Sequence, residues 1–182
     1  MNRRSFEHVI KAAAAVVQDE LVVVGSQPFS RTTRTRASLL TSMELDLYPR
    51  NAPERADEID GNLGDGSRFH EAYGYYGHGV GPETLTAPAG WEERLVRLEF
   101  PAIRKKGVAA VAWCLSMPDL VLAKLAAGRP HDLEFALEAL RAGLVDPEEL
   151  ALGVDLMPVS HRELVRDRLA GVVARAAGAK GD

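Results

Sequence analysis

The strongest constraint on the fold is the run Leu-Val-Val-Val at residues 21–24, which is apolar on both faces of any strand it forms. β-Branched residues favour extended backbone, and a strand without a polar face lies buried within a sheet. Two acidic residues, Asp19 and Glu20, precede the run, and Gly25 follows it. The run therefore predicts an interior strand that ends at Gly25, within a layered α/β protein.

A helix is expected before this strand, and a second strand after it. Ser5 is a suitable N-cap, and the apolar residues that follow it recur at helical spacing: Phe6, Val9, Ile10, Ala13, Val16 and Val17. The segment Met43-Glu-Leu-Asp-Leu-Tyr48 alternates between apolar and acidic residues as far as Leu47, and Pro49 follows Tyr48 and ends the segment. This alternation is typical of a half-buried strand, so we expect one face of it to be acidic.

The remaining segments before residue 116 continue a mixed α/β pattern. The segment from Pro53 to Leu63 is predicted to be a helix, and residues 94–100 and 108–115 are predicted to be strands. Residues 68–90 hold scattered Gly, Pro, His and Tyr, and we expect this stretch to be irregular.

From Ser116 onward the sequence becomes helical. Three pairs of residues have capping-box spacing: Ser116 with Asp119, Asp146 with Glu149, and Ser160 with Glu163. Three glycines are natural helix stops: Gly128, Gly143 and Gly178. We therefore expect an α/β (α+β) fold with a small mixed β-sheet flanked by helices over residues 1–115. A helical C-terminal part over residues 116–182 is expected to pack on this core.

Composition narrows the class of protein. The chain has 182 residues, 46% of them hydrophobic, and a net charge of −4, which argues against a broad basic surface for nucleic acid but not against a local basic cleft. Cys114 is the single cysteine, so no internal disulfide can form and a cytoplasmic location is expected. No apolar run approaches the roughly 20 residues that span a bilayer, so no membrane partner is expected.

The first candidate site lies where the two predicted strands carry polar residues. Period-2 geometry puts Glu44 and Asp46 on one face, and two adjacent carboxylates repel unless a cation such as Mg²⁺ lies between them. Gly25 allows close approach of the backbone, and Ser26 offers a hydroxyl and an N–H to a phosphate. The alternative is that the acids form the solvated face of an edge strand and that Gly25 and Ser26 form an ordinary turn.

The combination of these features resembles the nucleotidyltransferase superfamily of the polymerase-beta type. A strand, a Gly-Ser pair, a helix-length interval and a hydrophobic-acid-hydrophobic-acid-hydrophobic strand follow one another in that order. The resemblance implies that Gly25 and Ser26 grip a nucleoside triphosphate, and that Glu44 and Asp46 bind Mg²⁺ or Mn²⁺. It also implies a nucleotide-binding role for Ser42, because Ser or Thr often stands two residues before the first acid. Glu44 occupies a position where Asp is commoner.

A second motif lies about eighty residues downstream of the first. Asp119-Leu-x-x-x-Lys124-Leu, followed by Arg129 and Asp132, resembles the AbiEii-like branch, which includes abortive-infection and toxin–antitoxin nucleotidyltransferases. The resemblance implies that Lys124 contacts the nucleotide phosphates, that Asp132 orients Lys124 or the attacking group, and that Arg129 supports them. Taken alone, a lysine near the end of a helix is more often a solvated surface group.

Other candidates have a structural interpretation beside the functional one. Glu99 either supplies the third acid found in many superfamily members, as a further metal ligand, or is an outward-facing polar residue. Tyr75 and Tyr76 either stack on a base or pack a loop against the sheet. His70 and His78 are too few and too far apart for a zinc site. No P-loop pattern and no nucleophile elbow is present.

The resemblance implies a Mg²⁺-dependent nucleotidyltransferase that moves a nucleoside monophosphate from a nucleoside triphosphate to an acceptor hydroxyl. The implied acceptors are the 3′ end of RNA, such as tRNA, or a protein, and the implied partner is a cognate antitoxin if the chain is the toxin of such a pair. Basic residues for an RNA backbone are available: Arg31, Arg34, Arg36, Lys105 and Lys106. The alternatives are a catalytically weak binding or regulatory module with this fold, and an unrelated α/β domain.

Overall fold

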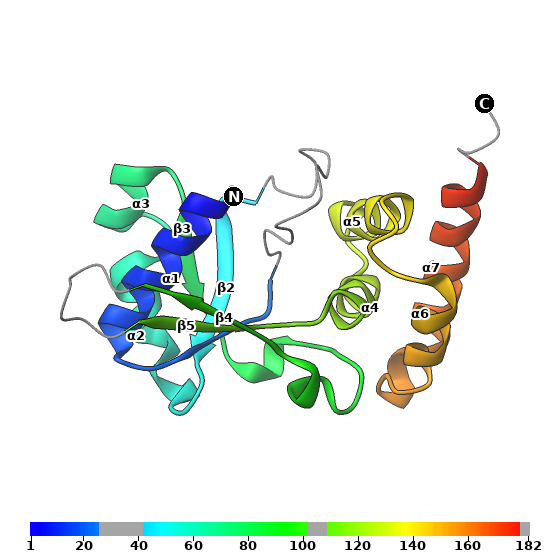
Figure 1. Cartoon of the computed structure of the whole chain (residues 1–182), viewed down its shortest axis with the longest axis horizontal. Helices are drawn as coiled ribbons and strands as arrows, with labels where there is room; N and C mark the ends of the chain where they lie inside the picture. The colour runs from blue at the N-terminus through cyan, green and yellow to red at the C-terminus, as the bar shows by residue number, and fades with distance from the viewer. Residues whose placement is uncertain (26–41, 102–108, 179–182) are drawn as a thin grey trace. The chain divides into compact units, whose positions relative to one another are not determined.

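The computed structural model describes residues 1–25, 42–101 and 109–178, and confirms the predicted mixed α/β class (Figure 1). The chain forms two compact units, which we call the sheet unit (Met1–Thr84 and Leu95–Cys114) and the helical unit (Leu85–Arg94 and Leu115–Asp182). The sheet unit holds α1 (Arg3–Val17), β1 (Leu21–Val23), β2 (Glu44–Pro49), η2 (Pro53–Arg55), α2 (Ala56–Leu63), α3 (Arg68–Tyr73), β3 (Tyr76–Gly79), η3 (Pro82–Thr84), β4 (Val96–Phe100) and β5 (Ala110–Cys114). The helical unit holds η4 (Trp91–Arg94), α4 (Met117–Ala127), α5 (Pro130–Arg141), α6 (Pro147–Val154) and α7 (Val159–Gly178).

The sheet has the strand order β3-β2-β1-β5-β4, with β1 at its centre. β1 pairs antiparallel with β2 and parallel with β5, while β3 is parallel to β2 and β4 is antiparallel to β5. All three residues of β1 are buried, as expected for a strand without a polar face. The strand β2, which carries the acidic residues, therefore lies directly beside the central strand β1.

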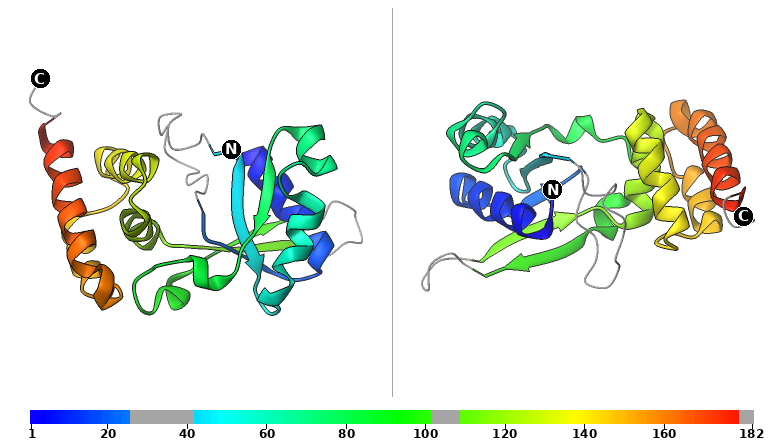
Figure 2. Two further views of the ribbon diagram at one scale, coloured as in Figure 1. Left: turned by 180° about the vertical axis from the view of Figure 1, so that it is seen from behind. Right: turned by 90° about the horizontal axis from the view of Figure 1, so that it is seen from above.

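Helices α1 and α2 pack against one face of the sheet, as the views of Figures 1 and 2 show. Their apolar residues form the core with the inward side chains of the strands: Phe6, Val9, Ile10, Ala13, Val17, Leu21, Val23, Leu45, Leu47, Ile59, Leu63, Phe100, Ala110, Ala112 and Cys114. Burial raises the pKa of the Cys114 thiol to about 12, so this cysteine is a core residue. The helix α1 begins earlier than Ser5 indicates, because the N-cap is Asn2, whose side chain accepts a hydrogen bond from the Ser5 N–H.

The stretch expected to be irregular, residues 68–90, contains the helix α3 and the edge strand β3. The β3 sequence is Tyr-Gly-His-Gly, which has low strand propensity, so its local pattern does not predict a strand. Its glycines instead permit close packing: a Cβ at Gly79 would lie 2.0 Å from the Ala56 carbonyl oxygen of α2, and one at Gly77 would lie 3.0 Å from Val9 Cγ1 of α1. Packing of Gly77 and Gly79 against the helices therefore stabilises this strand. The side chains of Tyr76 and His78 lie on its other face, away from the helices.

Gly79→Ala is expected to destabilise the sheet unit by about 1–3 kcal/mol, because the added methyl group meets the backbone of α2 rather than a side chain that can move. Gly61 is the matched control, since a Cβ there meets nothing within 4 Å and its place inside α2 favours alanine. Gly61→Ala is expected to stabilise by roughly 0.5–1 kcal/mol. Urea unfolding followed by circular dichroism measures both, and equal free energies of unfolding for the two variants would contradict the packing argument.

The helical unit is a cluster of four helices joined by short turns (Figure 2). The predicted cap of α4 is confirmed, because the Ser116 side chain accepts a hydrogen bond from the Asp119 N–H. At the other end of α4, Gly128 adopts a left-handed conformation with φ of 69°, and Arg168 of α7 donates hydrogen bonds to the Leu125 and Ala126 carbonyls. None of the helices in the described parts of the chain combines the length and the apolar character that crossing a membrane requires.

A buried carboxylate, that of Asp119, helps to hold residues 85–94 within the helical unit, beside the hydrogen bond from the Ala89 N–H to the Leu156 carbonyl. The Arg94 guanidinium donates two hydrogen bonds to Asp119, from Nε at 2.9 Å and from Nη2 at 2.8 Å, and the Ser116 hydroxyl donates a third at 2.6 Å. Asp119 is 3% exposed, so these donors satisfy a carboxylate that is almost inaccessible to water.

Candidate metal and nucleotide site

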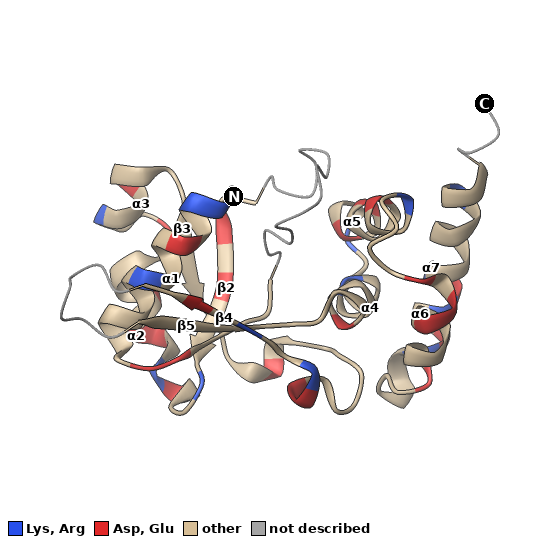
Figure 3. Ribbon diagram, viewed as in Figure 1, with Lys and Arg blue, Asp and Glu red and all other residues tan. Residues whose placement is uncertain are grey.

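The two acids of β2 share the face of the sheet opposite α1 and α2. Leu45 and Leu47 point into the core and are buried, so the alternating residues Glu44 and Asp46 point away from it and are half-buried. Figure 3 shows the acidic positions of β2 in red. Ser42 precedes the strand and anchors its first residue, since the Ser42 hydroxyl accepts a hydrogen bond from the Glu44 N–H and donates one to the Glu44 carbonyl.

The neighbouring strand β3 adds a histidine and a tyrosine to these acids. In the parallel pairing of β2 with β3, Glu44 lies opposite Tyr76 and Asp46 lies opposite His78. His78 Nδ1 is 2.8 Å from Glu44 Oε1 and 3.2 Å from Asp46 Oδ1, and the Tyr76 hydroxyl donates a hydrogen bond of 3.3 Å to Glu44 Oε2. One ligand atom from each of Glu44, Asp46 and His78 lies within 4.8 Å of the others.

The electrostatics of the cluster reflect two carboxylates at close range. Burial and the negative charge of Asp46 raise the pKa of Glu44, and these effects outweigh the contacts with His78 and Tyr76. Burial opposes protonation of His78, but the hydrogen bond to Asp46 and the charges of Glu44, Asp46 and Asp60 outweigh it and raise the pKa of His78. The cluster thus favours a positive charge between the two acids.

Gly25 completes the cluster from the end of β1. A Cβ at Gly25 would lie 2.9 Å from Asp46 Oδ2 and 3.3 Å from Asp46 Cβ, so the absence of a side chain gives the Asp46 carboxylate its space. The Val24 N–H donates a hydrogen bond of 3.1 Å to the Asp46 carbonyl, which holds the two segments together. The oxygen donors of Glu44 and Asp46 and the nitrogen donor of His78 converge beside the space that Gly25 leaves open, and this donor set fits a divalent cation. Ser26 lies outside the described residues, as do the basic residues Arg31, Arg34, Arg36, Lys105 and Lys106.

Gly25→Ala is expected to weaken binding of Mg²⁺ or Mn²⁺ by roughly tenfold, because the methyl group displaces the Asp46 carboxylate while the strands remain paired. Isothermal titration calorimetry of the metal with the purified protein measures the effect. Gly61→Ala, with no neighbour for its methyl group, serves as the control and should bind as the wild type does. Wild-type metal affinity in Gly25→Ala would show that metal binding does not need the space that Gly25 leaves beside the Asp46 carboxylate.

The residues of the second motif form a cluster of their own in the helical unit. Lys124 Nζ donates a hydrogen bond of 2.8 Å to Asp132 Oδ1, and Arg129 Nε donates one of 2.7 Å to Asp132 Oδ2. Asp132 is fully buried and Lys124 is 9% exposed, so this lysine is not the solvated surface group that its position near the helix end would suggest. The Lys124 ammonium also lies 5.2 Å from the centre of the Phe135 ring.

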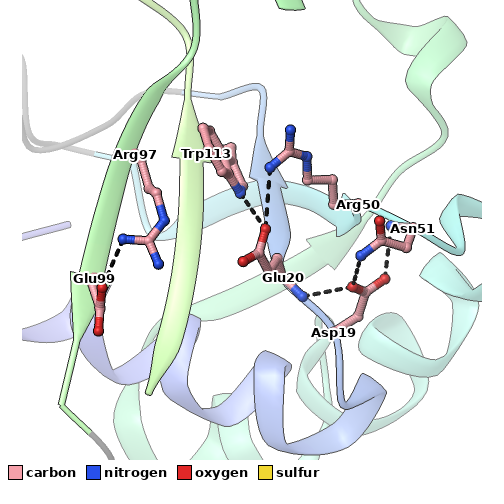
Figure 4. Close-up of polar contacts among 7 residues, drawn as sticks. All are labelled: Asp19, Glu20, Arg50, Asn51, Arg97, Glu99 and Trp113. Carbon is pink, nitrogen blue, oxygen red and sulfur yellow. Dashed lines mark hydrogen bonds and ion pairs between the residues drawn. The ribbon is translucent and has the colours of Figure 1, made fainter. Parts of the chain in front are cut away.

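Glu99 is not brought to the other acids. It lies on β4, and β1 and β5 separate this strand from β2, which places it about 14 Å away across the sheet. Glu99 Oε2 instead pairs with Arg97 Nη1 at 2.7 Å (Figure 4), on an exposed edge strand. This is the position of an outward-facing polar residue. The same figure shows Trp113 and Arg50 both donating to Glu20, at 2.6 and 3.2 Å.

His78 is the site residue that the sequence pattern missed. The alternation Tyr76-Gly77-His78-Gly79 is a weak period-2 signal, with two side chains on one face and two glycines on the other. The neighbouring Tyr75 packs instead, since its hydroxyl lies 2.9 Å from His8 Nδ1 and its ring contacts Phe69. His70 lies 2.9 Å from Asp65 Oδ1, outside the cluster.

The resemblance implies a mixed sheet with paired acids on one strand and a glycine just after the strand that precedes it, and β1, Gly25 and β2 have this arrangement, with β1 and β2 antiparallel. The comparison with protein families agrees. The chain belongs to the family described as "Nucleotidyltransferase of unknown function (DUF6036)", which it matches over residues 5–157. No significant match was found among curated proteins or among solved structures.

Proposed function

We propose that the protein is a nucleotidyltransferase that transfers a nucleoside monophosphate from a nucleoside triphosphate to an acceptor hydroxyl, with Mg²⁺ or Mn²⁺ as cofactor. The observation that carries this proposal is the convergence of Glu44 and Asp46 beside Gly25, in a chain of a nucleotidyltransferase family. Glu44 and Asp46 would hold the cofactor. A divalent ion bound there neutralises charge on the phosphate oxygens and lowers the pKa of the attacking hydroxyl.

The remaining residues bind and orient the nucleotide in this proposal. Gly25 and Ser26 would lie against the phosphates. A side chain at residue 25 would clash with the Asp46 carboxylate, and Ser42 holds the start of β2 in place. Lys124 contacts the phosphates, and Asp132 and Arg129 fix its direction through the buried ion pair. The acceptor oxygen forms a bond to the α-phosphorus as the bond to pyrophosphate breaks, and the hydroxyl proton leaves to solvent.

We further propose that the acceptor is the 3′ end of an RNA, such as a tRNA, or a protein hydroxyl, and that the protein acts as the toxin of a toxin–antitoxin or phage-defence pair. The support is the similarity of the segment from Asp119 to Asp132 to the AbiEii-like branch. A cognate antitoxin would then be the protein partner.

The test incubates the purified protein with each of four α-³²P-labelled nucleoside triphosphates, with Mg²⁺ or Mn²⁺, and with total RNA or total protein. Label that moves to one macromolecular fraction, with release of pyrophosphate, supports the proposal and identifies the acceptor class. Nucleotide binding without transfer to either fraction would favour a binding or regulatory module with the same fold.

A further inference from the structure

We propose that His78 is a direct ligand of the divalent ion through Nδ1, and that it makes the site select Mn²⁺ over Mg²⁺. The inference deepens the proposed function and rests on its metal site. It assigns a third protein ligand and a metal preference that two carboxylates on a strand do not supply.

The distances within the cluster fit shared coordination of one ion. Ligand atoms at about 2.1–2.2 Å from an octahedral ion lie roughly 3 Å apart when they occupy adjacent positions. His78 Nδ1 lies 2.8 Å from Glu44 Oε1 and 3.2 Å from Asp46 Oδ1, and one ligand atom from each of the three residues lies within 4.8 Å of the others. Each side chain thus already presents one donor atom to a common point.

The backbone holds His78 in this position. Its neighbours Gly77 and Gly79 face α1 and α2, and the tight approach of those helices fixes which face of β3 carries the imidazole. The direct pairing of Asp46 with His78 then sets the height of the ring along β2. Because Tyr76 donates to Glu44 Oε2, the other carboxylate oxygen, Oε1, is the one beside His78. The donor set therefore needs little rearrangement on binding.

The chemistry of the donors favours manganese. Mg²⁺ takes oxygen ligands almost throughout, whereas imidazole nitrogen suits the first-row transition metals. Mn²⁺ binds carboxylate oxygen as Mg²⁺ does, and as a first-row transition metal it also accepts imidazole nitrogen. One imidazole with two carboxylates is thus a site at which Mn²⁺ gains a ligand that Mg²⁺ uses poorly.

The experiment measures Mn²⁺ and Mg²⁺ binding to the full chain by calorimetry, together with pulsed electron paramagnetic resonance of the Mn²⁺ complex. We expect nitrogen coupling from a coordinated imidazole in the wild type, changed to the ¹⁵N pattern in protein labelled with ¹⁵N-histidine. His78→Ala should lose this coupling and weaken Mn²⁺ binding by about 10–100-fold, while Mg²⁺ binding changes by less than about threefold. His161→Ala, in the helical unit, is the matched control and should keep the wild-type spectrum.

Three results would overturn the inference: bound Mn²⁺ without nitrogen coupling, His78→Ala with unchanged or tighter Mn²⁺ binding, or Asp46→Asn that binds Mn²⁺ with wild-type affinity. The second result would make His78 a counter-charge that the ion displaces. The readout is independent of catalysis. If the Mn²⁺ complex shows nitrogen coupling but the protein transfers no nucleotide, the proposed function is refuted and this inference stands. If the protein transfers nucleotide with bound Mn²⁺ but shows no coupling, this inference is refuted and the proposed function stands.

Discussion

Asp46→Asn is expected to lower nucleotide transfer by roughly 10³-fold, about 4 kcal/mol of transition-state stabilisation, with the fold unchanged. An amide keeps the shape of the side chain but removes the charge that binds a divalent ion. The strand does not depend on that charge, because Leu45 and Leu47 anchor it in the core and the Asp46 carbonyl accepts the Val24 N–H. Transfer of label from the preferred nucleotide at saturating metal measures the loss, and thermal melting checks the fold.

The matched control for this substitution is Asp57→Asn. Asp57 is an exposed carboxylate in the first turn of α2, on the helical layer that covers the other face of the sheet. The same change of charge there should leave transfer within about twofold of the wild type, because a surface charge remote from the cluster is largely screened. Full activity in Asp46→Asn would remove this carboxylate from the catalytic site and with it the basis of the proposed mechanism.

Asp132→Ala is expected to destabilise the helical unit by about 3–5 kcal/mol, because it leaves the Lys124 ammonium almost buried without its carboxylate. Urea unfolding followed by circular dichroism measures the loss. The double variant Lys124→Met/Asp132→Leu removes both charges and should recover part of that stability. If Asp132→Ala unfolds at the wild-type urea concentration, the pair does not hold α4 to α5.

The contribution of Asp132 also depends on pH in a defined direction. Burial opposes ionisation, but hydrogen bonds and charges from Arg129 and Lys124 outweigh it and lower the pKa of Asp132 in the folded state. A lowered folded-state pKa stabilises the protein above the unfolded value, about 3.9, and the stabilisation is lost as the pH falls through the folded-state pKa. The difference in unfolding free energy between wild type and Asp132→Asn should therefore be full at pH 6 and shrink below about pH 4.

The parts of the fold that follow from the sequence are those with a local cause. The β-branched run at residues 21–24 and the alternation after Met43 are sufficient to predict β1, β2 and the shared face of Glu44 and Asp46, because side chains on a strand alternate by geometry alone. The cap at Ser116 and the left-handed Gly128 likewise depend on a few adjacent residues.

The parts that could not be predicted depend on which strands become neighbours. The pairing of Asp46 with His78 joins residues 32 positions apart, on a strand whose glycines make sense only once α1 and α2 are packed against it. Glu99 shows the same limit, since its hydrophobic-acid-hydrophobic pattern is as regular as that around Asp46. Strand order, which no local pattern encodes, places β1 and β5 between the two. Period-2 spacing thus identifies the face of a residue but not its distance from a site.

The double hydrogen bond from Arg94 to Asp119 bears on how the chain folds as it is synthesised. The segment Leu85–Arg94 emerges before β4 and β5, yet its binding carboxylate lies in a helix that emerges after them. One edge of β1 pairs with β2, but the other edge stays unpaired until its parallel neighbour β5 has been synthesised. Neither unit can therefore be completed before the other has begun, and an incomplete chain that ends before Asp119 exposes an unsatisfied strand edge or a loop without its anchor. The interleaved order of the chain thus places the last two strands of the sheet that carries Glu44 and Asp46 after the first segment of the helical unit, and the anchor of that segment after the sheet.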